Sequence, residues 1–123
     1  MKQVTAVTVA VLGLVGFLAS DAVAAEKFQK LTGSQIRAKV AGMEITDEAH
    51  WRDVYERSGT LTSYEMGNKK IGKWRVQKDQ LCLDLKEELA GCYEVWLSGK
   101  NVELRLEGSN SGELEGVLRP PER

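Results

Sequence analysis

From Met43 onward, apolar and polar residues alternate in short runs, and turn residues interrupt the runs about every ten positions. Side chains of a strand point alternately to two faces, so a period of two predicts antiparallel strands with one buried face. We therefore expect a mainly β fold, an antiparallel meander of about seven or eight short strands forming a curled sheet or a small barrel. The predicted strands lie at residues 43–46, 50–57, 60–66, 70–77, 80–85, 91–97, 102–107 and 113–118.

The turns between these strands also predict their registers, because opposite residues of a hairpin lie at equal distances from its turn. We place turns at residues 58–59, 67–68, 78–79, 86–90, 99–100 and 109–112. The residues that these turns bring opposite each other are apolar: Val76 with Leu81, Trp74 with Leu83, Val95 with Leu104, and Leu97 with Val102. The strands from residue 70 to residue 107 are therefore expected to share one apolar face.

The two cysteines of the chain, Cys82 and Cys92, fall opposite each other in the hairpin around residues 86–90, on the face away from the core. Opposite cysteines on neighbouring strands can form a disulfide, and small exported domains use disulfides to supplement weak cores. Redox centres usually have a C-x-x-C spacing at a helix start, which is not the spacing here. We predict a structural disulfide, with a redox or metal role as the alternative.

Residues 1–25 are typical of a secretory signal peptide. One lysine precedes the uncharged, largely apolar segment 4–19, and Ala22 and Ala24 supply the small residues of a cleavage site. The apolar segment is shorter than the ~20 residues of a membrane-spanning helix. We expect residues 26–123 to form a single β-rich domain with a short C-terminal tail, located in the periplasm or secreted, without a membrane anchor after signal cleavage.

The charge balance bears on the partners of this domain. The chain has 17 lysine and arginine residues and 18 aspartate and glutamate residues. Nucleic acids and anionic membranes favour a surface of one sign, so neither is expected as a partner.

One short N-terminal helix is predicted at residues 33–41. Thr32 and Gln35 have the spacing of a capping box, and Leu31 can pack on Ile36 across the helix start. Gly42 is a natural helix end.

The sequence supports no catalytic residue, metal site or cofactor. The single histidine, His50, lies near Asp47 and Glu48, but zinc and copper sites normally need more nitrogen or sulfur ligands. No G-x-S-x-G motif accompanies it. The other charged residues pair with opposite charges across the predicted outer face: Lys73 with Asp84, and Glu94 with Arg105.

Trp96 departs from this polar outer face, beside Glu94 and opposite Glu103. The helix or the C-terminal segment could cover it; otherwise it could anchor a partner, because exposed tryptophans often dominate binding energies. The candidate residues for partner binding are Trp96, Trp51, Tyr55, Lys86, Glu87 and Glu88.

The signal peptide, the capped helix, the W-R-V-x-K-D-x-L-C-L-D hairpin and the G-C-Y-E-V-W strand together resemble small uncharacterised periplasmic proteins of Gram-negative bacteria with a lipocalin-like or inhibitor-like antiparallel β-fold. The resemblance covers most of the mature chain. Its motifs are residues that make the fold, so it implies no catalytic residues.

These observations lead to a first hypothesis and two alternatives. The first is an exported, non-enzymatic binding module that acts on an unknown periplasmic protein. The second is a small-ligand carrier of the lipocalin type, against which we count few small residues pointing inward. The third is a small hydrolase-like enzyme that uses His50 or the acidic residues.

Overall fold

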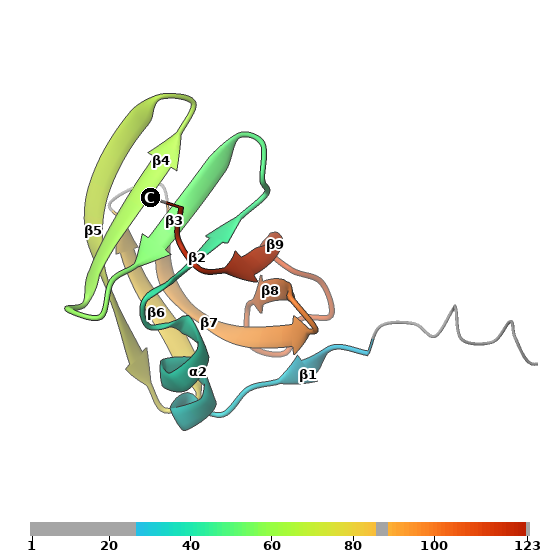
Figure 1. Ribbon diagram of the computed structural model, residues 1–123. Helices are drawn as coiled ribbons and strands as arrows, with labels where there is room; N and C mark the ends of the chain where they lie inside the picture. The colour runs from blue at the N-terminus through green and yellow to red at the C-terminus, as the bar shows by residue number, and fades with distance from the viewer. Residues whose placement is uncertain (1–26, 86–88, 123) are drawn as a thin grey trace, which may run out of the picture.

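An antiparallel barrel of eight strands forms the body of the protein (Figure 1). The computed structural model describes residues 27–85 and 89–122. Its elements are β1 (Gln29–Lys30), α2 (Gly33–Val40), β2 (Met43–Thr46), β3 (Trp51–Tyr55), β4 (Thr60–Glu65), β5 (Asn68–Gln77), β6 (Gln80–Leu85), β7 (Leu89–Ser98), β8 (Asn101–Arg105) and β9 (Leu114–Arg119). The predicted signal peptide and the candidates Lys86, Glu87 and Glu88 lie outside the described residues.

The strands form a closed meander. Each strand from β2 to β8 pairs with the next one along the chain, and β9 pairs with both β8 and β2. The prediction of an antiparallel meander is confirmed, and of the two expected arrangements the structure has the small barrel. The additional strand β1 pairs with β7 at Leu97 and Trp96, beyond the Tyr93 position where β6 ends its own pairing with β7.

The predicted registers are confirmed in three consecutive hairpins. The observed partners include Val76 with Leu81, Trp74 with Leu83, Cys82 with Cys92, Val95 with Leu104, and Leu97 with Val102. Their apolar members belong to one core inside the barrel, either fully buried or packed against buried residues. The alternation of side chains therefore determines which residues face the interior.

One turn lies a residue away from its predicted place. Glu65 pairs with Asn68, so the turn between β4 and β5 consists of Met66 and Gly67 rather than residues 67–68. Both turn residues have positive φ, 52° at Met66 and 87° at Gly67. Two-residue hairpin turns of this kind match the twist of the strands that they join. The ladder of β4 and β5 thus extends one pair further than the position of Asn68 suggested.

The helix α2 lies across one end of the barrel (Figure 1). The Thr32 side chain accepts from the Gln35 backbone N–H, and the Gln35 side chain accepts from the Thr32 backbone N–H, which confirms the capping box. Ile36 and Val40 are fully buried in the same core as the barrel interior. The backbone N–H of Gly33 donates to Asp79 Oδ1 at 2.7 Å, joining the helix start to the β5–β6 turn. The helix therefore closes this end of the interior.

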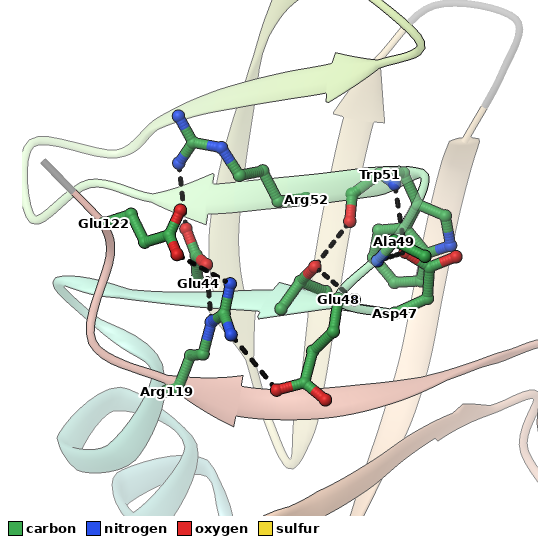
Figure 2. Close-up of polar contacts among 9 residues, drawn as sticks. Glu44, Asp47, Glu48, Ala49, Trp51, Arg52, Arg119 and Glu122 are labelled. Carbon is green, nitrogen blue, oxygen red and sulfur yellow. Dashed lines mark hydrogen bonds and ion pairs between the residues drawn. The ribbon is translucent and has the colours of Figure 1, made fainter.

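A buried carboxylate holds the seam between the first and last strands of the barrel (Figure 2). Glu44 of β2 points outward but has no exposed surface. Its Oε1 accepts from Arg52 Nη1 of β3 and its Oε2 accepts from Arg119 Nε of β9, each at 2.9 Å. Arg119 also pairs with Glu48 at 3.1 Å and with Glu122 at 3.5 Å. These contacts tie three neighbouring strands and the C-terminal tail together.

The disulfide lies on the outer face of the barrel between β6 and β7, away from the seam. Cys82 of β6 and Cys92 of β7 are bonded, and their Cα atoms are 3.9 Å apart. Both cysteines face outward, next along their strands to inward-facing residues, which confirms the predicted face. Cys82 is nonetheless buried. The disulfide joins the two strands of the β6–β7 hairpin, which runs toward the end of the barrel opposite α2.

Replacing Glu44 with glutamine should lower the free energy of unfolding by about 3 kcal/mol, because two arginines at the seam would lose their shared carboxylate. The measurement is the urea unfolding midpoint at pH 7. The control is Glu122→Gln, whose side chain is 68% exposed and whose ion pair should contribute about 0.5 kcal/mol or less. Equal unfolding midpoints for Glu44→Gln and the native chain would show that the Glu44 carboxylate does not stabilise the seam.

Replacing both cysteines with alanine should lower the stability of the oxidised protein by about 2 to 3 kcal/mol, because the closed loop restricts the unfolded chain. Urea unfolding with and without a reductant measures this loss. The reductant should shift the midpoint of the native chain and leave that of the double variant in place. A double variant as stable as the oxidised native chain would show that the disulfide contributes nothing.

Candidate functional site

A hollow opens at the end of the barrel opposite α2. It lies where β3 and β9 begin and where β4 and β6 end, and its volume is about 270 Å³. This is just under the roughly 300 Å³ at which pockets for drug-sized ligands begin. The residues that line it are Trp51, Asp53, Ser63, Glu65, Asn68, Lys70, Leu85 and Leu114. We call this hollow the mouth pocket.

The alternation of the strands places polar residues inside the barrel at this end. On β3, Trp51, Asp53 and Tyr55 share the inward face, and Ser63 of β4 lies directly opposite Asp53. The same inward row turns apolar toward α2, where Tyr55 pairs with Leu61 and both are fully buried. One end of the interior is therefore a sealed apolar core, and the other is a polar pocket.

Small residues at inward positions make room for the pocket and its walls. A Cβ at Gly116 would lie 3.2 Å from Cη2 of Trp51 and 2.8 Å from the backbone oxygen of Thr46. Glycine thus admits the Trp51 ring at the seam. Gly72 and Gly91 are also inward, since they neighbour Leu85 and Leu83 of the core.

Asp53 is the most deeply placed charged residue of the mouth pocket, and it is only 4% exposed. Burial raises the pKa of its carboxyl from 3.8 to about 6, the hydrogen bond from Ser63 opposes this rise, and the neighbouring carboxylate of Glu65 adds to it. A carboxyl with such a pKa changes charge within the physiological range.

Tyr55 lies two residues deeper on the same face of β3. Its side chain is fully buried, and its hydroxyl has no hydrogen-bond partner among the residues that the structure describes. Burial raises the pKa of this hydroxyl well above its usual value, and Asp53 and Tyr93 raise it further. The Tyr93 hydroxyl instead donates to the Ala90 carbonyl at 3.3 Å. Buried hydroxyls are normally hydrogen-bonded, so Tyr55 is an exception that requires an explanation.

The structure does not bring the predicted partner-binding aromatics together. Trp51 lines the mouth pocket, Tyr55 lies in the core, and Trp96 lies on the outer face of β7. A partner in this conformation could reach the exposed part of Trp51 or Trp96, but Tyr55 offers no exposed surface.

Trp96 is half-buried on the outer face, with Arg105 and the paired strand β1 as neighbours. The Arg105 guanidinium lies 4.2 Å from its ring centre, and β1 pairs beside it at Lys30. Its Nε1 donates to Glu94 at 2.9 Å, and Lys30 Nζ lies 3.4 Å from the same carboxylate. Donation from Trp96 lowers the pKa of Glu94, and the charge of Lys30 lowers it further. The group is a structural network on the outer face.

His50 lies in the exposed turn between β2 and β3 and does not line the mouth pocket. Its Nδ1 lies 3.0 Å from Asp47 Oδ2, and Asp47 Oδ1 accepts from the backbone N–H groups of Ala49, His50 and Trp51. Desolvation opposes the effect, but these hydrogen bonds hold the pKa of Asp47 well below its usual range. Asp47 therefore stabilises a turn.

Within residues 27–85 and 89–122, no three His, Cys, Asp or Glu side chains gather in a way that could hold a metal ion. In the same ranges, no helix has both the length and the apolar character needed to cross a membrane.

Sequence reasoning missed the polar residues of the mouth pocket. Asp53 and Ser63 have the same strand parity as Tyr55 and Leu61, so they had to face inward once those residues were assigned to the core. A signal was therefore present, a polar residue at inward parity on each of two neighbouring strands. The strand around Trp51 alternates too poorly for this parity to be assigned from the sequence.

Replacing Asp53 with asparagine should stabilise the protein by about 3 kcal/mol at pH 7.5. The raised pKa means that the folded state binds a proton more tightly than the unfolded state, so stability falls as pH rises from about 4 to 6. Asparagine removes this penalty, and the difference should vanish near pH 3.5. Urea unfolding across this range measures it, with Asp84→Asn on the exposed outer face as control. A less stable Asp53→Asn at pH 7.5 would contradict the analysis.

Comparisons with protein-family models, with curated proteins and with solved structures found no match for this chain.

Proposed function

We propose that this protein is an exported, non-enzymatic barrel that binds a small polar ligand in its mouth pocket. The observation that carries the proposal is the nearly buried carboxylate of Asp53 inside the open end of a barrel whose other end is closed by α2. A concave pocket with a few convergent polar groups is the usual form of a small-molecule site.

The energetics of Asp53 support this choice. Burying a carboxylate opposes folding, and nearby Glu65 adds to the cost. An apolar residue at the same position would extend the core toward the mouth. Proteins commonly retain such destabilising groups where binding or catalysis needs them.

The position of His50 favours binding over the hydrolase alternative. The only imidazole of the chain lies in the exposed β2–β3 turn and does not line the mouth pocket. A carboxylate with a pKa of about 6 could act as a base, but Ser63 is its hydrogen-bond donor and not its nucleophilic partner in a triad with histidine. Binding of a small ligand needs only the polar groups that line the mouth pocket.

Export rests on two independent features. Residues 1–25 have the pattern of a signal peptide, and the Cys82–Cys92 disulfide is of a type that persists in oxidising compartments. We propose the periplasm or the extracellular space as the location. A lipocalin-like ligand carrier, one of the alternatives from the sequence, is compatible with this location and with the closed barrel.

A second candidate is the binding of another exported protein, and a surface feature favours it. Met66 and Ile71 are the two most exposed large apolar side chains of the described residues, 71% and 61% exposed, and both belong to the β4–β5 hairpin. Exposed apolar residues on a projecting hairpin can serve as an anchor for a partner.

Native mass spectrometry of the protein isolated from the periplasm without reduction distinguishes the two candidates. We expect a small-molecule adduct on the native chain and its loss in Ser63→Leu, because leucine would fill the pocket beside Asp53. The matched control is Lys69→Leu, which adds the same side chain at an exposed, outward position of β5.

Three results would contradict the ligand-binding proposal. They are a native chain without an adduct, an adduct that persists in Ser63→Leu, and a co-purifying protein in place of a small molecule. The last result would favour the second candidate, and it should then be abolished by Met66→Ser with Ile71→Ser.

A further inference from the structure

The chemistry of the mouth pocket also indicates the class of ligand, an inference that rests on the proposed function. The deepest charged group is the Asp53 carboxylate, whereas Glu65, Asn68 and Lys70 line the exposed rim. A ligand that enters the pocket therefore meets negative charge at its inner end.

The Asp53 carboxylate has acceptor capacity left for a ligand. An ionised carboxylate offers about four acceptor positions, and the hydrogen bond from Ser63 uses one. A buried carboxylate is stabilised most by a cation that also donates hydrogen bonds.

Tyr55 lies deeper than Asp53 on the same strand, outside the lining of the pocket. It is fully buried, lies on the same inward face of β3 and is close enough to Asp53 to feel its charge. Its hydroxyl oxygen has no protein donor among the described residues. The residues that line the mouth pocket do not include Tyr55, so a ligand there meets the Asp53 carboxylate and not this hydroxyl.

The aromatic side of the pocket also suits a cationic group. Trp51 lines the pocket beside Asp53 and is held there by the space at Gly116. The face of an indole ring attracts cations, most strongly when both are partly removed from water.

We propose that the ligand of the mouth pocket is a small primary amine that inserts its ammonium group between Asp53 and Trp51. The three N–H donors of the ammonium match the open acceptor positions of the Asp53 carboxylate. The remainder of the ligand faces the rim formed by Glu65, Asn68 and Lys70.

Binding of such a ligand depends on pH. The groups around Asp53 that carry or can change charge are Glu65 of β4, Lys70 of β5, Tyr55 of its own strand and Tyr93 of β7. With a pKa of about 6, Asp53 loses its charge as pH falls, and an ammonium group should then bind roughly tenfold more weakly at pH 5 than at pH 7.5.

The test is a titration of the ¹⁵N-labelled protein with n-butylamine, n-butanol and butyrate, followed by the indole N–H signals of its tryptophans. Trp51 reports on the pocket. Trp74 and Trp96, whose indole N–H groups donate to Glu56 and Glu94, are internal references. Butylamine should shift the Trp51 signal saturably at pH 7.5 and roughly tenfold more weakly at pH 5.

Asp53→Asn should lose at least tenfold in butylamine affinity, and Lys69→Leu should retain it. Because Asp53→Asn is expected to be more stable than the native chain, its loss of binding could not be attributed to unfolding. Equal or stronger shifts with butanol or butyrate would overturn the amine as ligand class and leave the proposed function in place. A Trp51 signal that none of the three moves would overturn the amine, and the native mass spectrum would then decide the proposed function separately.

Discussion

Closure of the barrel between β2 and β9 is the constraint on which the rest of the structure depends. Only three residue pairs join these strands, among them Glu44 with Arg119. The buried carboxylate of Glu44 adds to this short ladder because each of its oxygens accepts from an arginine on a neighbouring strand. Trp51 and Leu114, which form walls of the mouth pocket, belong to strands on either side of the seam. An open seam would therefore remove both the enclosed core and the pocket.

The closed barrel has two chemically different ends built on one alternation of side chains. Near α2, the buried side chains of Ile36 and Val40 complete an apolar core that orders the strands. That order holds Asp53 and Ser63 opposite each other at the mouth, where the buried carboxylate of Asp53 opposes folding and lines the mouth pocket. The apolar end supplies the stability that the polar end reduces, a common relation between a core and a binding site.

Local sequence patterns predicted the hairpins well because turn chemistry and alternation act over short distances. The pairing of Cys82 with Cys92 followed from the neighbouring turns in this way. The β4–β5 turn was displaced by one residue because Gly67 and Asn68 are both turn formers, and only the pairing of Asn68 with Glu65 decided between the alternatives. The mouth pocket escaped prediction because the strand that carries Asp53 mixes polar and aromatic residues on its inward face, so its parity was ambiguous.

The sequence by itself determined the antiparallel meander, the registers of three hairpins, the capped helix and the position of the disulfide. Each depends on residues within a turn, a helix start or a single hairpin. Only the tertiary structure decided that the sheet closes, that Glu44 is buried and that Trp96 lies against Arg105. Glu44 and Arg119 are 75 positions apart, so their contact exists only after all eight strands have curled around one core. The physical reason is that burial and charge pairing at a seam depend on the whole path of the sheet, whereas turns and alternation depend on near neighbours.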